Sequence, residues 1–394
     1  MTLFTEYPEK DEQAFSDRIR QATRARMDQL YGDAAKALRD THAKTQACIK
    51  GTLEVFDFDE AAIQQTVAQA AGLSVAQQMA MSLKQGLLAQ PRQYPVWIRF
   101  ANGRTTVESD YVDDTRSMSV KVMDVDGERL PVSHEDHSQD LIVQNGDTFF
   151  IRSIRSYYGF FKAISSSTLW VIVWLFLHPK QKAALARITS HAPKSLLTER
   201  YWSGSASALG LPTNFDPSQP GQVPVTYPAV VKFAFTPVSN QSPYTPLPRA
   251  ARPEADRKLA KTRHKQGNTP DNYYREELVQ ALGQPDATYC WDFQIQVQTD
   301  PEMSIDDVTV SWDEAKAPFF TVGRLTVSHQ TVNIEAQCDF CENLRFSPWN
   351  GLAVHRPVGA LNRLRSSVYA IVGEYRHQKQ KLDYQEPTGN ETWD

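Results

Sequence analysis

The chain has few cysteines for its length, no marked excess of either charge and no apolar run long enough to cross a bilayer. Four cysteines in 394 residues exclude the disulfide framework typical of small secreted proteins. A formal net charge of −4 provides no basic field for phosphate groups, so no nucleic acid partner is expected. The first residues contain no apolar segment typical of a secretory signal. We therefore expect a reducing, cytoplasmic setting.

Two of the cysteines form a Cys-x-x-Cys pattern, Cys338 and Cys341. The pattern could indicate a redox pair or half of a zinc site. No second Cys-x-x-Cys or His pair would complete a zinc site, and no βαβ pattern surrounds a redox pair. We interpret the pattern as incidental.

The longest apolar run, LWVIVWLFL at 169–177, is shorter than the roughly 20 residues that a membrane-spanning helix needs. The run favours a buried helix. A peripheral membrane contact through 169–177 is the alternative.

Alternation of apolar and polar residues predicts several β-strands, separated by long loops and helical insertions. Strands are expected at 48–55, 94–100, 229–235, 290–298 and 321–327, and helices at 11–39 (with a break near Gly32), 60–90 and 271–282. The Pro-rich stretch 237–253 is expected to be a linker or wrapping loop. This order suits an antiparallel barrel with helices outside it, and hence the α+β class.

A further helix is predicted over residues 361–376, where Arg365 and Tyr369 stand four residues apart on one face. A guanidinium beside a phenol lowers the pKa of the phenol from its usual value of about 10. A phenolate is a hard anionic ligand for ferric iron and a known haem ligand. The spacing alone is common, however, and by itself favours an ordinary surface pair.

The flanking residues give the pair a context. The turn Phe346-Ser347-Pro348-Trp349-Asn350, the Arg365-x-x-x-Tyr369 pair and the following Arg376-His377 resemble the proximal segment of monofunctional haem catalases. The intervening His355-Arg356-Pro357 is similar to the shorter catalase-related haem proteins, which include the coral allene oxide synthase domain. The resemblance implies that Tyr369 binds the iron of haem b and that Arg365 is its charge partner.

The N-terminal third carries a matching pattern. Arg39-x-x-His42-Ala43-Lys44, followed by a strand with Gly51-x-x-Glu54-Val55, resembles the distal segment of catalases. The resemblance implies an acid–base role for His42 and contacts to haem propionates for Arg39 and Arg99. A neutral imidazole suits that role because its pKa lies near working pH. Where catalases place a hydroxyl residue that bonds the distal His, this chain has Ala101.

The run from Gln139 to Arg152 also resembles catalases. It implies that Asn145 donates to the bound peroxide, with Gln144 as the alternative, and that three aromatic residues line the pocket: Phe149, Phe150 and Tyr157. The segment 113–122 resembles a catalase turn and strand, which we interpret as a structural ion-pair network. The cluster His134-Glu135-Asp136-His137 lies in a polar loop and is expected to be solvated rather than metal-bound.

Taken together, the resemblance implies a catalase-like antiparallel β-barrel with added helices. It divides the chain into an N-terminal helical arm (1–38), a haem-binding barrel (39–378) and a polar tail (379–394). We predict a haem b-dependent enzyme that acts on hydrogen peroxide or on a lipid hydroperoxide. The alternatives are a fatty-acid hydroperoxide isomerase or lyase of the allene oxide synthase type, a non-catalytic haem-binding protein, and a lipocalin-like barrel that carries an apolar ligand.

Overall fold

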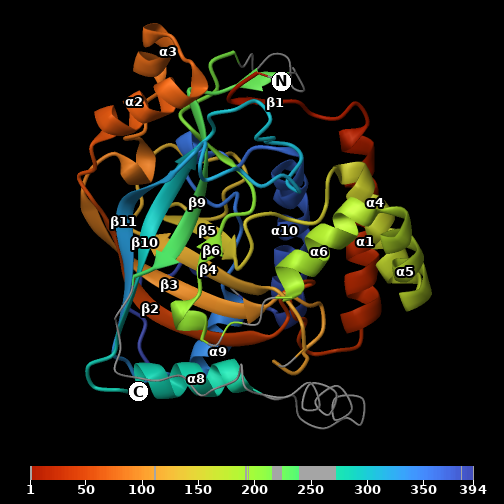
Figure 1. The fold of residues 1–394 in the computed structure, drawn as a ribbon. Coiled ribbons are helices and arrows are strands. Elements are labelled where there is room, and N and C mark those ends of the chain that lie inside the picture. The colour runs from red at the N-terminus through yellow and green to blue at the C-terminus, as the bar shows by residue number, and fades with distance from the viewer. Residues whose placement is uncertain are drawn as a thin grey trace.

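The structure is a computed structural model that describes residues 2–110, 112–190, 193, 195–214, 224–238, 272–382 and 384–393. Eight antiparallel strands form a closed barrel in the order β2-β3-β4-β5-β6-β9-β10-β11, with β11 paired to β2 (Figure 1). Their bounds are Thr45–Val55, Arg92–Asn102, Arg116–Met123, Ser138–Gln144, Tyr201–Trp202, Ala229–Pro237, Thr288–Val297 and Phe319–Ser328. The barrel confirms the α+β class and the antiparallel architecture predicted from the alternation.

Three shorter strands complete the sheets. β7 (Ser207–Leu209) pairs with β9, and β1 (Thr5–Glu6) pairs with β8 (Val225–Thr226) in a separate two-stranded sheet. Gly51, in β2, lies where strands crowd together: a Cβ there would stand 2.8 Å from the carbonyl oxygen of Thr326. A glycine inside a strand often marks such a close approach of another backbone.

The alternation in β2 and β3 divides their side chains between two apolar clusters. Ile49 and Ile98 belong to the main barrel core, whereas Cys48 and Trp97 belong to a second cluster, which also includes Cys341. Cys48 pairs in register with Arg99, so Arg99 lies on the same face as Cys48 and Trp97. That face carries the candidate site.

The helices cover the barrel from several sides (Figure 1). α1 (Glu12–Tyr31), α4 (Ile154–Ser166) and α10 (Ala360–Gln380) pack together around Ile19, Ile154 and Leu364. The other helical elements in the described residues are α2 (Glu60–Ala71), α3 (Val75–Ala80), α5 (Thr168–Leu177), α6 (Pro179–Ser190), α8 (Tyr273–Leu282), α9 (Ile334–Asn343) and the 3₁₀ turns η1 (Gly86–Leu88), η2 (Leu196–Thr198) and η4 (Ala353–His355).

Two expectations about helices are wrong. α1 ends at Tyr31 and no helix resumes toward Arg39. There tertiary contacts override helix propensity: Ala37 packs with Met27 and Tyr375, and Asp40 pairs with Arg26 at 3.5 Å.

Residues 239–253 of the expected Pro-rich loop lie outside the described residues.

The second wrong expectation concerns the apolar run. It does form a helix, α5, but the helix is not buried: Trp174 is buried, whereas most of the other side chains are exposed. No helix within the described residues is both long and apolar enough to span a bilayer.

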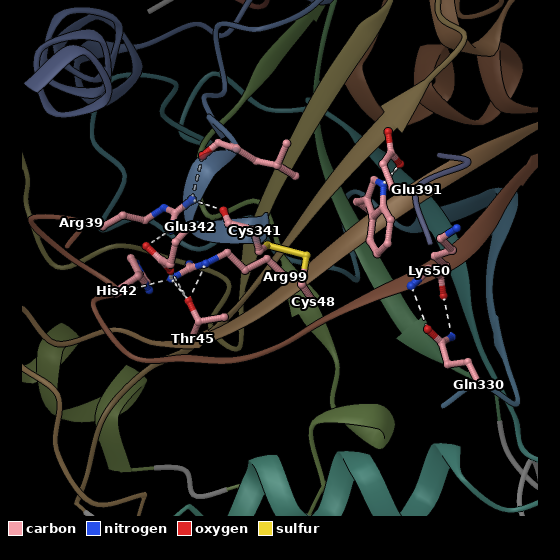
Figure 2. The surroundings of a disulfide bond; sticks show 12 residues. Arg39, His42, Thr45, Cys48, Lys50, Arg99, Gln330, Cys341, Glu342 and Glu391 are labelled. Carbon is pink, nitrogen blue, oxygen red and sulfur yellow. Dashed lines mark hydrogen bonds and ion pairs between the residues drawn. A yellow bond between two sulfur atoms is a disulfide. The ribbon is translucent and has the colours of Figure 1, made fainter. Parts of the chain in front are cut away.

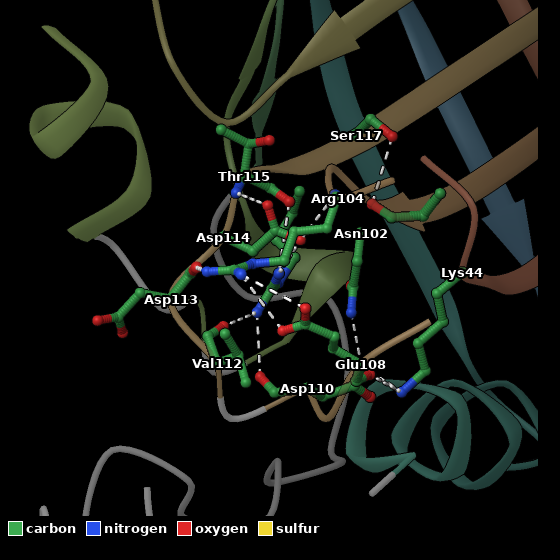
Figure 3. A network of polar contacts seen from close by, with 12 residues as sticks. Lys44, Asn102, Arg104, Glu108, Asp110, Val112, Asp113, Asp114, Thr115 and Ser117 are labelled. Carbon is green, nitrogen blue, oxygen red and sulfur yellow. Dashed lines mark hydrogen bonds and ion pairs between the residues drawn. The ribbon is translucent and has the colours of Figure 1, made fainter. Parts of the chain in front are cut away.

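Beside the barrel, Arg116 of the segment 113–122 belongs to a polar network, as predicted, but the network extends to Lys44, Asn102 and Asp110 outside that segment (Figure 3). Asp110 accepts hydrogen bonds from Lys44 and Asn102, each at 2.8 Å, and Arg116 donates to the backbone carbonyls of Asp110 and Val112. These contacts join the start of β2, the end of β3 and the start of β4, and so brace the loops next to the candidate site.

Lys121 anchors a separate buried network. It lies between Glu135 and Asp140, at 2.5 and 2.7 Å. The expected solvation of the His134–His137 loop is therefore wrong for Glu135, which is buried because it balances the charge of Lys121.

Candidate functional site

His42 lies in the loop between α1 and β2, in an uncommon backbone conformation. Its φ of 58° is in the left-handed region, which side chains other than glycine rarely adopt. Two hydrogen bonds hold it there: its N–H donates to the Gly103 carbonyl at 3.3 Å, and its carbonyl accepts from Arg99 Nη2 at 2.7 Å. Such strain persists only where the surroundings impose it, and it often marks functional positions.

The side chain of His42 is half-buried and neutral at neutral pH. Desolvation lowers its pKa to about 3, and nearby positive charges act in the same direction, first Arg99, then Arg365 and Arg39. Its Nδ1 is buried and has no partner within hydrogen-bond geometry in the described part of the chain, although the nearby Asn102 backbone acts to raise the pKa of the ring. The buried Ala101 pairs in register with Thr45 on β2 and carries no hydroxyl that could fill that gap.

A buried cluster of charges surrounds the same loop (Figure 2). Glu342, at the end of α9, contacts three guanidiniums: Arg39 at 2.5 Å, Arg376 at 3.3 Å and Arg99 at 3.4 Å. Thr45 Oγ1 accepts from Arg99 and donates to Glu342. We call Arg39, Arg99, Arg376 and Glu342 the arginine cluster.

In the arginine cluster the positive charges outnumber the negative charge. Burial alone would raise the pKa of Glu342, but the three positive charges hold it below its usual range. Burial and mutual repulsion lower the pKa values of Arg99 and Arg376 to about 9, still above neutral pH. Three cations therefore face one anion, which leaves an excess of two positive charges in a largely desolvated region.

A disulfide joins the barrel to the helix that carries Glu342. Cys48 in β2 and Cys341 in α9 are bonded, with Cα atoms 6.0 Å apart (Figure 2). The spacing of Cys338 and Cys341 is therefore no redox pair: Cys341 bonds to Cys48, a pairing that the sequence did not predict, and Cys338 is a free, half-buried cysteine. Because Cys341 precedes Glu342, the bond fixes the carboxylate next to β2.

Arg365 and Tyr369 both lie on α10, as predicted, and both are half-buried. Arg365 Nη1 donates to Ser205 Oγ at 3.1 Å and to Asn362 Oδ1 at 3.3 Å. Within the described residues no hydrogen bond joins Arg365 to Tyr369. Both side chains act on the pKa of Tyr157, which is raised mainly by desolvation. Tyr369 raises this pKa further, and Arg365 lowers it. The structure therefore brings Tyr157, Arg365 and Tyr369 into one region, and Arg365 links it electrostatically to His42.

Gln144 is the last residue of β5 and Asn145 follows it, and the two side chains differ in whether a donor is left for a ligand. Asn145 is buried; its Oδ1 accepts from the Arg116 N–H at 2.7 Å, and its Nδ2 has no hydrogen-bond partner in the described part of the chain. Gln144 Nε2 instead donates to the Thr148 carbonyl at 2.8 Å. Asn145 therefore retains a donor for a ligand, which favours it over Gln144.

The three aromatic residues predicted to line a pocket form one layer with α4 and α5. Phe149 and Phe150 lie 4.8 Å apart, Phe150 contacts Phe160 at 5.0 Å, and Tyr157 packs in the same cluster. The guanidinium of Arg365 lies 5.7 Å from the Phe149 ring centroid.

A cavity opens on the barrel side of Arg365. Its lining includes Leu141, Ser205, Phe233 and Asn362, but not His42, Asn145 or Tyr369. The cavity therefore contacts the predicted proximal residue Arg365 but neither the predicted iron ligand nor the predicted distal residues.

Sequence reasoning missed Glu342, the centre of the arginine cluster. Its signal in the sequence is weak, because a glutamate near the end of a short polar helix is usually solvated. Only its position four residues before Phe346, in a segment that resembles catalases, pointed to the right region.

The comparisons with known proteins bear on the fold. No protein-family model matches the sequence, and no curated protein matches it either. Among solved structures, a fungal catalase superposes with a TM-score of 0.57 and 16% identity over 88% of this chain and 61% of its own. A bacterial catalase gives 0.57 and 15% over 91% and 62%, and catalase A from Saccharomyces cerevisiae gives 0.57 and 15% over 93% and 67%.

At this identity the likeness establishes a catalase-like fold. The chain spans about six-tenths of the length of the first two catalases.

Proposed function

We propose that the chain is a haem b-dependent enzyme that acts on hydroperoxides, with Tyr369 as the axial iron ligand. The observation that carries the proposal is the arginine cluster beside His42, in a catalase-like fold. The arginine cluster carries an excess of two positive charges, which the two negative charges of the haem b propionates would balance. Buried charges require partners, so a dianionic edge is the ligand feature that these guanidiniums fit.

Side-chain atoms outside the arginine cluster also suit haem as the ligand. Tyr369 supplies a phenol oxygen that has no hydrogen-bond partner among the described residues, and a phenolate suits ferric iron. Asn145 Nδ2 is a buried donor without a hydrogen-bond partner among the described residues, and such an atom is costly unless a ligand satisfies it. When bound, haem supplies the redox chemistry of O–O bond cleavage.

The chain's own residues would manage the proton and the developing charge. His42 is neutral at working pH because desolvation and the neighbouring guanidiniums lower its pKa to about 3. A base this weak is less effective than one whose pKa lies near the working pH, so the imidazole would hold the peroxide proton only briefly before returning it to the departing oxygen. The Asn145 amide would donate to a peroxide oxygen and stabilise negative charge on it. Phe149 and Phe150 would exclude water around these groups.

The structure also bears on which hydroperoxide is used. The buried Ala101 offers no hydroxyl to His42 Nδ1, which has no side-chain partner among the described residues. We therefore expect the imidazole to be held less firmly than paired proton transfers on hydrogen peroxide require. The aromatic layer is continuous with the apolar α5. We therefore expect weak dismutation of hydrogen peroxide and better turnover of an organic or fatty-acid hydroperoxide. Rearrangement of a fatty-acid hydroperoxide, which needs no external reductant, is the second candidate.

Haem titration tests the cofactor step. The protein should bind haem b at one equivalent and show the absorption of a tyrosinate-ligated ferric haem. Tyr369→Phe should abolish that spectrum. Tyr375→Phe is the matched control, since Tyr375 lies on the same helix and donates to the Met27 carbonyl instead. An unchanged spectrum in Tyr369→Phe would remove Tyr369 from the axial position, and failure of the wild-type chain to bind haem would reject the proposal.

Turnover of the haem-loaded protein tests the enzymatic step. His42→Ala should keep haem and lose about 10²–10⁴-fold in kcat with a fatty-acid hydroperoxide. His137→Ala, on an exposed loop, should retain full activity. Haem binding without turnover of any hydroperoxide would leave a non-catalytic haem protein.

A further inference from the structure

The helix α5 presents a large apolar surface to solvent. Its exposed side chains include Leu169 (67%), Trp170 (58%), Ile172 (59%), Phe176 (78%) and Leu177 (67%). Ile164, near the end of α4, and Val173 are also exposed. In Figure 1 α5 stands at the outer edge of the molecule, beyond α1. Contiguous apolar surface of this kind marks an interaction site.

The charge around this surface is one-sided. Residues 148–190 contain six Lys or Arg and no Asp or Glu, in a chain whose net charge is −4. All six are exposed and lie before or after the helix along the chain. Arg152 pairs with Asp307 at 3.1 Å and Arg187 donates to Thr148 Oγ1, so the basic border consists of Arg155, Lys162, Lys180 and Lys182. An apolar surface with a basic border complements a surface that is apolar inside and anionic at its edge.

We propose that α5 and its basic flanks dock the protein onto a bilayer that contains anionic lipids. A ten-residue helix is about 15 Å long, which is too short to cross a membrane but suited to lying along its interface. The helix is apolar around most of its circumference, so its exposed side chains could insert among acyl chains. Trp170 is of the type enriched at the membrane interface. Basic residues near an anionic leaflet add attraction.

A second copy of the chain is a less favourable occupant of the same surface. A symmetric dimer would place each basic border against its own copy, and such like charges repel each other. An anionic lipid surface satisfies both the apolar and the charged part of the patch.

The inner side of α5 connects this surface to the candidate site. Trp174 packs on Phe160 at 5.1 Å, Phe160 on Phe150, and Phe150 on Phe149, which lies below Arg365. This continuity makes a membrane-derived lipid hydroperoxide the natural substrate class. That step rests on the proposed function, whereas docking itself does not.

Vesicle co-sedimentation tests docking without haem or turnover. The wild-type chain should sediment with mixed phosphatidylcholine–phosphatidylserine vesicles and bind pure phosphatidylcholine more weakly. Leu169→Glu with Phe176→Glu should weaken binding at least about tenfold, since two large apolar side chains lose their burial in the bilayer. The matched control is Val75→Glu with Met79→Glu on α3, which alters side chains that are 73% and 78% exposed and adds the same charge. This control should bind like the wild type.

A second pair tests the basic border. Lys180→Gln with Lys182→Gln should weaken binding to the anionic vesicles by about fivefold per residue and leave binding to pure phosphatidylcholine unchanged. The proposal is overturned if the wild-type chain stays in the supernatant, or if both glutamate pairs bind equally. It is also overturned if sedimentation velocity shows a dimer that Leu169→Glu with Phe176→Glu converts to monomer, since the surface would then belong to a second copy. None of these results depends on whether haem binds.

Discussion

Replacing Glu342 with glutamine would test the charge balance of the arginine cluster. The substitution keeps the size of the side chain and removes its negative charge. It also replaces one carboxylate oxygen with an NH2 donor, so the side chain can accept either beside Thr45 and Arg99, on Oε1, or beside Arg39, on Oε2, but not at both. Glu342 contacts guanidiniums at 2.5, 3.3 and 3.4 Å. The three cations would then lie together, largely desolvated, with no anion in contact.

The expected cost is large because the pairs are buried. Breaking a buried ion pair by removing one partner typically costs about 3–5 kcal/mol. The side chains of Arg99 and Arg376 are each 3% exposed, so water can replace little of the lost interaction. We expect Glu342→Gln to lower the free energy of unfolding of the haem-free protein by about 3 kcal/mol or more at neutral pH.

The loss should depend on pH with a defined sign. The folded-state pKa of Glu342 is depressed below the value of about 4.3 expected in the unfolded chain. Its stabilising contribution is therefore complete above that pH and is lost as the pH falls through the folded-state pKa. The difference between wild type and Glu342→Gln should be constant near neutral pH and shrink as the solution is acidified below about 4.

Urea unfolding followed by circular dichroism, at several pH values, measures both effects. Glu335→Gln is the control, since Glu335 is exposed on the first turn of the same helix and should cost at most about 1 kcal/mol. A difference under about 1 kcal/mol for Glu342→Gln at neutral pH, or one that grows in acid, would refute the charge argument.

Three further predictions concern single sites. Ala101→Ser should raise kcat/KM for hydrogen peroxide about tenfold relative to an organic hydroperoxide, because a hydroxyl there could orient the distal imidazole; no change would show that the missing hydroxyl is not the cause. Burial raises the pKa of Glu277 to about 7, so its ionisation destabilises the fold as pH rises from about 4.5 to above 7. The free energy of unfolding of Glu277→Gln, relative to that of the wild type, should therefore rise by up to about 3 kcal/mol as the pH goes from 5 to 8. For Glu276→Gln, at an exposed position, this difference should stay constant in the same unfolding series. Cys341→Ala should lower the free energy of unfolding by about 2–4 kcal/mol under non-reducing conditions, and Cys338→Ala should lower it much less. Equal thermal unfolding midpoints of the two variants would argue against the Cys48–Cys341 bond.

The sequence by itself determined the features that depend on neighbouring residues. The two-residue alternation in 48–55 and 94–100 predicted β2 and β3 because successive side chains on a strand point to opposite faces. The 3.6-residue period after Leu361 predicted α10 and placed Arg365 and Tyr369 together on it. Strand patterns spread along the chain suited an antiparallel barrel with helices outside it, and the resemblance to catalases made that prediction specific.

Only the tertiary structure decided which side chains are buried and which charges meet. Glu342 and Arg99 are 243 residues apart, and no local pattern could pair them, nor join Cys48 to Cys341. The apolar run at 169–177 shows the same limit: its composition predicted a helix, but whether that helix is covered depends on the rest of the fold. Burial and charge pairing arise from contacts between distant segments, whereas periodicity is a property of the segment itself.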